Sequence, residues 1–211
     1  QCVVDLATAG EENLERAKRL TLESAIKIHG KVLRDEKQEG GFEIQVTDLH
    51  IYSIAEEYPL GKKEHGVDFL MNNRHLWLRT KRQWAIMKVR NSALFAIHRF
   101  FQSRGFMQMD SPILTGNACE GTTTLFDTIF YKDDLPAYLS QSGQLYAEAT
   151  AMAMGKVYTF GPTFRAERSL TPRHLSEFWM IEPEMAFYDL EMNMNLIEEF
   201  VRTVVTDVYT E

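Results

Sequence analysis

The sequence predicts an α+β protein, on three observations. Residues 25–34 and 42–52 alternate apolar and polar side chains, which is typical of half-buried strands. Residues 80–103 instead repeat apolar side chains at steps of three and four, which is typical of an amphipathic helix. A polar loop between two apolar flanks near residue 170 predicts an antiparallel hairpin. A β-rich first part is therefore followed by a larger part that mixes helices with antiparallel strands.

The first part begins with a short helix, predicted over residues 11–20. The strand over 25–34 follows, and a charged turn that ends in two glycines joins it to the strand over 42–52. Residues 58–66 contain a proline and glycines and are predicted to form a turn-rich linker.

The second part begins with the long helix over residues 80–103, which we expect to end at Gly105. Residues 106–112 are predicted to form a strand that ends at Pro112. The last helix covers residues 190–208, with Asp189 placed to cap its first turn. This apolar helix needs a surface to pack on and little chain remains to supply one, so we expect the sequence to be a piece of a longer protein.

Composition narrows the class of protein. At 211 residues with 45% apolar side chains, the chain can bury a core, and one or two domains are expected. The net charge of −7 gives no general attraction for nucleic acid, so any such contact would depend on local basic runs. Cys2 and Cys119 form no disulfide framework and lack zinc-ligand spacing, so we expect reduced thiols in a cytoplasmic protein. No apolar run approaches the roughly 20 residues of a membrane span.

The hairpin near residue 170 carries the most specific chemistry. Its first flank ends at Arg165, and its return flank contains His174 and Phe178. Arginine offers a rigid fork of donors that matches phosphate oxygens, and an aromatic face can stack on a purine. The spacing alone predicts either a nucleotide clamp or an ordinary hairpin with surface ion pairs.

The sequence of this hairpin resembles motif 2 of the class II aminoacyl-tRNA synthetases. Arg165 and Glu167 match its Arg-x-Glu strand, and His174 and Phe178 match its return strand. The resemblance implies that Arg165 holds the ATP α-phosphate, that His174 with Arg173 beside it reaches the γ-phosphate, and that Phe178 stacks on adenine. It places Glu167 near the ATP and the acceptor end of tRNA. The loop departs from the usual pattern at Leu170 and Pro172, so its own contacts are less secure than the role of Arg165.

The helix over 80–103 and the strand after it resemble motif 1 of the same class. In that family the helix and strand form a dimer contact, and the proline touches the partner's active site; the matching residue is Pro112. A symmetric homodimer is the expectation. The apolar stripe by itself would rather indicate a plain core helix, and only the resemblance makes it an interface.

The first part resembles the second half of an oligonucleotide-binding (OB-fold) β-barrel, the anticodon-binding domain of these enzymes. The resemblance implies three regions. Residues 1–58 would be the C-terminal part of the OB-fold domain, residues 59–73 a linker, and residues 74–211 the N-terminal part of the class II catalytic domain. Motifs 1 and 2 would be present and motif 3 absent, and with it the Mg²⁺ ligands.

Residues 138–148 are the run that selects the amino acid in the aspartyl/asparaginyl group of this class. Gln141 and Gln144 would position the backbone of the substrate. Aspartyl enzymes carry a lysine where this chain has Ala147, and a buried carboxylate without its counter-ion would cost several kcal/mol. A neutral carboxamide needs only hydrogen bonds, so the resemblance implies asparagine rather than aspartate.

The resemblance also places carboxylates around the α-ammonium group of the substrate. Glu120 lies in the glycine-punctuated segment 116–124, which matches a loop that closes over the bound amino acid. Glu182 matches a carboxylate for the ammonium, with Glu184 as the alternate candidate. An exposed acid on a flexible loop remains the plainer interpretation of Glu120.

The implied reaction is the ATP-dependent activation of asparagine to its adenylate and transfer to tRNA(Asn), with Mg²⁺ beside Arg165. The 211-residue piece alone is expected to be inactive, since motif 3 would lie outside it. Two alternatives stay open. One is a paralogue of the same fold that makes free asparagine from aspartate; the strand pattern over 25–52 counts against it, because such proteins lack the barrel. The other is a non-catalytic RNA-binding module.

Overall fold

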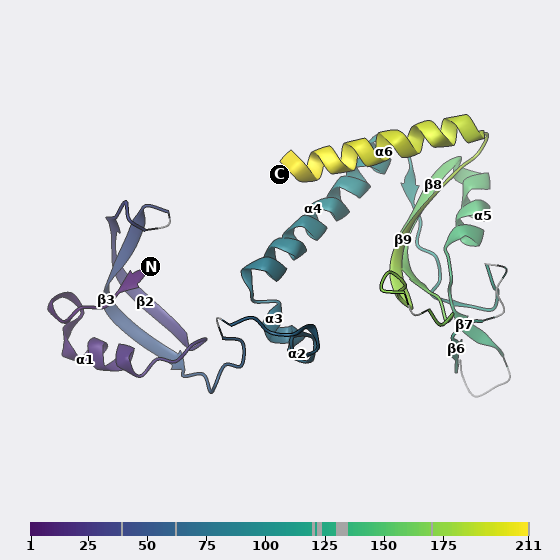
Figure 1. Ribbon diagram of the computed structural model, residues 1–211. Helices are drawn as coiled ribbons and strands as arrows, with labels where there is room; N and C mark the ends of the chain where they lie inside the picture. The colour runs from purple at the N-terminus through teal and green to yellow at the C-terminus, as the bar shows by residue number, and fades with distance from the viewer. Residues whose placement is uncertain are drawn as a thin grey trace. The chain divides into compact units, whose positions relative to one another are not determined.

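A computed structural model describes residues 1–38, 40–61, 63–119, 121, 124–129, 135–169 and 171–210. The chain divides into two compact units, Gln1–Thr80 and Lys81–Glu211. Both contain helices and strands, which confirms the α+β prediction (Figure 1). Within the ranges that the structure describes, no helix is long and apolar enough to cross a membrane.

The first unit is built on a three-stranded sheet in the order β1-β3-β2. Its strands are β1 (Cys2–Val3), β2 (Ala25–Arg34) and β3 (Phe42–Ser53). The β2–β3 hairpin is antiparallel, as predicted, and its register runs from Ala25 opposite Ser53 to Arg34 opposite Phe42. Strand β1 pairs in parallel with β3 and was not predicted, because so short a strand shows no alternation.

Helix α1 (Leu6–Lys18) begins five residues before the predicted start at residue 11. Asp5 caps it: the carboxylate accepts a hydrogen bond from the Thr8 backbone N–H at 2.9 Å. This bond is the main reason why the pKa of Asp5 lies below its ordinary value. Gly10, at φ +76°, interrupts the helical backbone, so the regular repeat that the sequence shows starts only after it.

Two short helices, α2 (Val67–Asn72) and α3 (Arg74–Trp77), complete the first unit. Residues 54–61 and 63–66 before them form neither helix nor strand, in keeping with their turn-rich composition. Domain boundaries at residues 58 and 74 stay a prediction.

The second unit contains two small sheets, in the orders β4-β8-β9 and β5-β7-β6. Its elements are α4 (Lys81–Ser103), β4 (Met107–Gln108), β5 (Leu114–Thr115), β6 (Asp127–Thr128), β7 (Ala137–Leu139), α5 (Gln144–Met154), β8 (Lys156–Phe164), β9 (Glu177–Met185) and α6 (Leu190–Thr210). The predicted helix over 80–103 and the hairpin are confirmed. The predicted strand over 106–112 is wrong in length, because only Met107–Gln108 pairs, with β8, and the chain then continues into the other sheet at β5.

The β8–β9 hairpin has two chemically different faces. Side chains alternate along a strand, and the register pairs Thr159 with Glu182 and Thr163 with Phe178 on one face. The other face carries Tyr158, which belongs to the apolar core. Figure 1 draws α5 on one side of this hairpin and α4 with α6 on the other. The polar face next to α5 is the one that carries the predicted site residues, and we call it the site face.

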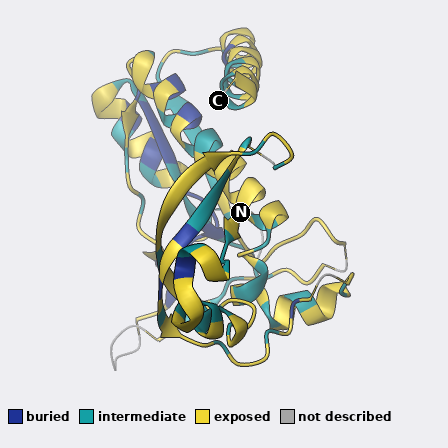
Figure 2. Ribbon diagram, turned by 90° about the vertical axis from the view of Figure 1, so that its left-hand side faces the viewer, coloured by how far each residue is buried: buried dark blue, intermediate teal, exposed yellow. Residues whose placement is uncertain are grey.

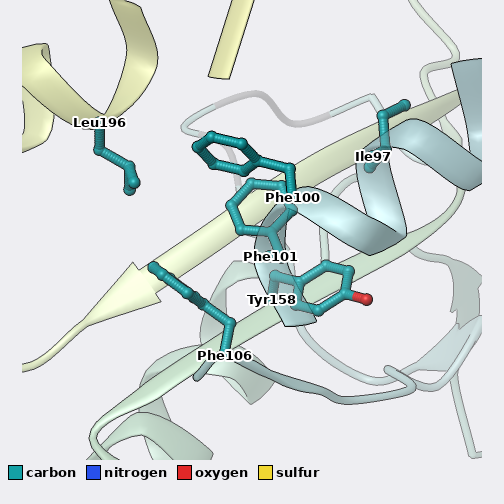
Figure 3. Close-up of a cluster of buried hydrophobic side chains, with 6 residues drawn as sticks. All are labelled: Ile97, Phe100, Phe101, Phe106, Tyr158 and Leu196. Carbon is teal, nitrogen blue, oxygen red and sulfur yellow. The ribbon is translucent and has the colours of Figure 1, made fainter. Parts of the chain in front are cut away.

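The core of the second unit lies between α4, α6 and the opposite face of β8–β9. Phe101 is 1% exposed and stacks on Tyr158 with ring centroids 4.7 Å apart, while Leu196 of α6 reaches toward the same aromatic group (Figure 3). The buried members of the cluster are Ile97, Phe100, Phe101, Phe106, Tyr158 and Leu196. Aromatic rings of this size dominate the burial of apolar surface, so this cluster holds α4 and α6 on the sheet.

Helix α6 is confirmed, and Asp189 caps it by accepting a hydrogen bond from the Met192 N–H at 2.8 Å. The helix packs inward through Leu196, Phe200 and Val204. Much of its remaining surface is exposed, as Figure 2 shows in yellow. Many of the exposed residues are apolar; those of the predicted stripe are Leu190, Met194, Ile197, Val201 and Val205. Because apolar residues occur on several faces of α6, the sequence alone did not indicate which face packs against the core.

Candidate active site

A hollow of about 620 Å³ opens between the two arms of the hairpin beyond β8 and β9. Its wall brings together five residues that the sequence singled out: Arg165, Glu167, Arg173, His174 and Phe178. The Arg165 backbone N–H donates to the Ser176 carbonyl at 3.0 Å, which ties the two arms beside the hollow. The Arg165 guanidinium carbon lies 5.6 Å from the centre of the Phe178 ring. A fork of donors therefore stands next to an aromatic face, as phosphate and purine binding requires.

The cations of the return arm are more exposed to solvent than Arg165. His174 and Arg173 are exposed, whereas Arg165 is half-buried. The His174 imidazole Nδ1 shares a short hydrogen bond with the Thr171 hydroxyl, which anchors one side of the ring. Of the three cations, Arg165 is therefore the least exposed to solvent.

The second group of predicted residues lies in the turn that precedes α5. Gln141 is 2% exposed and the neighbouring Ser140 and Ser142 are also buried. The Ser140 hydroxyl donates to the Ser142 carbonyl at 2.8 Å, and the Ser142 hydroxyl accepts from the Gln144 N–H at 3.0 Å. These bonds fix residues 140–144 as a rigid turn, which we call the Ser-Gly turn. A rigid turn is suited to hold a small ligand by its backbone and amide groups.

Glu182 is bound to this turn. One carboxylate oxygen, Oε2, accepts from the Gly143 N–H at 2.9 Å and from the Thr159 hydroxyl at 3.1 Å. The other, Oε1, accepts a short hydrogen bond from the Ser142 hydroxyl. A carboxylate can accept about four hydrogen bonds, and the described residues donate three, so they leave one acceptor position, at Oε1, for a donor from a ligand.

Gln144 lies one turn before Glu148 on α5, and its side-chain N–H₂ donates to the Glu148 carboxylate at 2.8 Å. This contact turns the Gln144 oxygen away from Glu148, and that oxygen faces the Cys119 thiol at 3.9 Å.

Glu184, the alternate candidate, lies farther along the site face. Burial, then the charges of Glu148 and Glu182, raise the pKa of Glu184 above its ordinary value. Glu182, by contrast, is hydrogen-bonded to the Ser-Gly turn, so it is the better placed of the two to meet a ligand there.

The hollow and the Ser-Gly turn are joined directly. The Phe164 N–H, next to Arg165, donates to the Ser140 carbonyl at 2.9 Å. Ala147 lies on the same side of the sheet, where it is fully buried with Ala151 against Val157 of β8. Arg165 and Ala147 therefore share the site face, with the Ser-Gly turn between them.

Two predicted residues stand apart from this arrangement. Pro112 is exposed, and it follows Ser111, whose hydroxyl lies beside the Ser-Gly turn at Gly143. Glu120 lies outside the described residues. Among the residues that are described, no three His, Cys, Asp or Glu side chains converge to hold a metal ion, so no Mg²⁺ site is assigned. Cys2 and Cys119 are both free thiols.

Residues 66–211 match the family described as tRNA synthetases class II (D, K and N). The chain belongs to this family. The match covers both parts of the site, from Arg165 and Phe178 to the Ser-Gly turn.

Over the aligned residues, relatives in the family are more than half identical to the chain. The asparagine–tRNA ligase of Symbiobacterium thermophilum is 57% identical over 208 residues, which are 99% of this chain and 47% of the relative. The asparagine–tRNA ligase of Thermus thermophilus is 54% identical over 209 residues, 99% of this chain and 48% of the relative. The chain thus spans about half the length of the curated relatives it matches.

Solved structures agree in fold. Asparaginyl-tRNA synthetase from Pyrococcus horikoshii, complexed with asparaginyl-adenylate, superposes with a TM-score of 0.94 at 39% identity, over 99% of this chain and 48% of that one. The enzyme from Entamoeba histolytica, in complex with the same adenylate, gives 0.83 at 26% identity over 100% of this chain and 48% of that one. These structures support a partial OB-fold followed by an incomplete class II catalytic domain.

Three residues of the site were given no role by the sequence: Ser142, Gly143 and Thr159. The first two lie inside the recognised run of 138–148, so a signal was present, but only the glutamines were interpreted. Thr159 gave no signal, because a threonine in a strand is an ordinary occurrence. Its position opposite Glu182 depends on the register of β8 and β9, which a sequence alone does not fix.

Proposed function

We propose that the protein containing this chain is an asparagine–tRNA ligase, which activates asparagine with ATP and transfers it to tRNA(Asn). The observation that carries the proposal is the 2.9 Å hydrogen bond from the Phe164 N–H to the Ser140 carbonyl, because it joins the phosphate-binding end to the Ser-Gly turn. The asparagine–tRNA ligases that are 53–57% identical to this chain over 208 aligned residues support the choice of reaction.

At the nucleotide end, we assign the ATP α-phosphate to Arg165 and the adenine ring to Phe178. Both line the same hollow, and the 5.6 Å separation between guanidinium and ring leaves the two groups side by side. Arg173 and His174, on the exposed arm, would contact the outer phosphates of ATP. Glu167, at the rim, would contact the ATP or the acceptor end of the tRNA.

At the amino-acid end, Gln141, Gln144 and Glu182 would hold asparagine against the Ser-Gly turn. The Gln144 N–H₂ group is bound to Glu148, and the Gln144 oxygen, which accepts from the Cys119 thiol at 3.9 Å, has a second lone pair for an N–H of the ligand. Glu182 offers the remaining acceptor position at Oε1 to an N–H of the bound amino acid. Glu120 is kept as a proposed partner of the α-ammonium group. Ala147 is an apolar methyl with no charge, so the described residues here favour a carboxamide over a carboxylate.

The reaction follows from this placement. The asparagine carboxylate attacks the α-phosphorus of ATP; a new P–O bond forms, the bond to the β-phosphate oxygen breaks, and pyrophosphate leaves. A ribose hydroxyl of the terminal adenosine of tRNA then attacks the activated carbonyl, and AMP leaves. Arg165 would stabilise the charge that develops on the α-phosphate oxygens, and the rigid turn would hold the carboxylate in line. Mg²⁺, when bound, would neutralise phosphate charge, but no described residue is assigned to it.

The remaining parts of the chain fit the same proposal. Residues 1–58 would belong to an OB-fold anticodon-binding domain, 59–73 to a linker and 74–211 to the catalytic domain. The first half of α4 exposes apolar side chains, including Trp84, which is 61% exposed, and supports a homodimer contact near Pro112. The free thiols suit a cytoplasmic protein.

The test is ATP–pyrophosphate exchange by the full-length gene product with each of two amino acids. We expect exchange with asparagine at least about a hundred-fold faster than with aspartate, because an unpaired buried carboxylate costs about 3 kcal/mol or more. Exchange that depends on aspartate, with ammonia-dependent formation of asparagine, would instead indicate the asparagine-forming paralogue. No exchange with either, together with RNA binding, would indicate a non-catalytic module.

A further inference from the structure

We propose that Thr159 is a positioning residue of the amino-acid site, which holds the Glu182 carboxylate against the Ser-Gly turn. Thr159 is 2% exposed and lies directly opposite Glu182 in the β8–β9 register. Its hydroxyl donates to Glu182 Oε2 at 3.1 Å. This inference rests on the proposed function, since it assigns a role within the site where asparagine would bind.

The two oxygens of Glu182 are bound differently, and Thr159 is the reason. Oε2 accepts from both Thr159 and the Gly143 N–H, at 3.1 and 2.9 Å. Oε1 accepts only from the Ser142 hydroxyl among the described residues. Thr159 and Gly143 together therefore fill both acceptor positions of Oε2, and the free position lies on Oε1, where a ligand's N–H could reach it.

The backbone at Gly143 lies so close to Thr159 and Glu182 that there is no space for a side chain. A Cβ atom at Gly143 would come within 2.7 Å of the Thr159 hydroxyl oxygen, 2.9 Å of the Ser111 hydroxyl and 3.1 Å of Glu182 Oε2. Only a glycine lets the backbone approach both Thr159 and Glu182 so closely. The turn, the carboxylate and the threonine thus form one packed unit.

Thr159→Val removes the donor and keeps the shape of the side chain. We expect the KM for asparagine in pyrophosphate exchange to rise about ten-fold, since a hydrogen bond to a charged group is lost, while the KM for ATP changes less than two-fold. Thr159→Ser keeps the hydroxyl and should restore the asparagine KM to within about three-fold. Thr163→Val is the matched control: Thr163 is a buried threonine of the same strand whose hydroxyl donates to the Phe178 carbonyl at 3.2 Å, not to Glu182.

A second measurement does not depend on activity. Hydrogen exchange of the Gly143 amide, followed by NMR in the full-length gene product, should speed up about ten-fold in Thr159→Val and not in Thr159→Ser or Thr163→Val, because Oε2 is then held by Gly143 alone. If Thr159→Val fails to fold, Thr159→Ala, which also lacks the donor, takes its place in both measurements.

The outcomes separate the two claims. An asparagine KM that stays within two-fold in folded Thr159→Val, or an equal rise in Thr163→Val, overturns the positioning role while asparagine ligase activity stands. A wild-type protein that shows no exchange with asparagine overturns the proposed function. In that case Gly143 amide exchange still decides whether Thr159 holds Glu182 to the turn.

Discussion

Replacing Arg165 by alanine will lower kcat/KM for ATP in pyrophosphate exchange about a thousand-fold, which corresponds to about 4 kcal/mol. The Arg165 guanidinium lies next to Phe178 in the hollow, where it can reach the α-phosphate as negative charge builds up on it. Loss of the guanidinium removes both the charge and the forked donors. Arg165→Lys keeps the charge without the fork, so its loss should be smaller, about thirty-fold to a hundred-fold.

The matched control for this prediction is Arg168→Ala. Arg168 is exposed, three residues farther along the same arm, and is not part of the wall of the hollow. Its replacement should change exchange less than two-fold. Equal losses in Arg165→Ala and Arg168→Ala would mean that general positive charge, rather than a fixed phosphate contact, serves the reaction.

Phe101→Ala will lower the free energy of unfolding of the second unit by about 3–5 kcal/mol. Phe101 is 1% exposed and contacts four other rings, those of Phe100, Phe106, Tyr158 and Phe200. Removing it leaves a cavity at the point where α4, α6 and β8 meet, and the neighbouring rings can fill it only in part. Urea unfolding of the 211-residue chain, followed by circular dichroism, measures the change.

Phe187→Ala provides the comparison within the same unit. The Phe187 side chain is fully exposed between β9 and α6, so its loss should change the free energy of unfolding by less than about 0.5 kcal/mol. If the two variants lose the same stability, the aromatic cluster is not the core that holds the helices on the sheet.

Elements with a strong repeat could be predicted from the sequence closely. The β2–β3 hairpin, α4 and the start of α6 at Asp189 agree with the structure, because alternation, helical spacing and a capping residue are local properties. Short strands were not predicted, because β1 and β5 each contain two residues and form only by pairing with a neighbouring strand. The start of α1 was misplaced because Gly10 breaks its repeat.

The candidate site was predictable where chemistry coincides with a motif. Arg165, His174 and Phe178 were found because their residue types and spacing suit phosphate and purine. Thr159 was not, because its role depends on which residue of β9 lies opposite it. Glu182 was interpreted only as a ligand contact, whereas the structure shows that three of its hydrogen bonds go to the protein's own Ser142, Gly143 and Thr159.

The central claim is that the nucleotide end and the amino-acid end form one site on a single face of the β8–β9 hairpin. A crystal structure of the full-length gene product with a non-hydrolysable analogue of asparaginyl-adenylate tests it most directly. We predict adenine on the Phe178 ring, the phosphate mimic at the Arg165 guanidinium, and the asparagine part against the Ser-Gly turn beside Glu182. An analogue bound with its amino-acid part away from that turn, or on the Tyr158 face of the hairpin, would contradict the account.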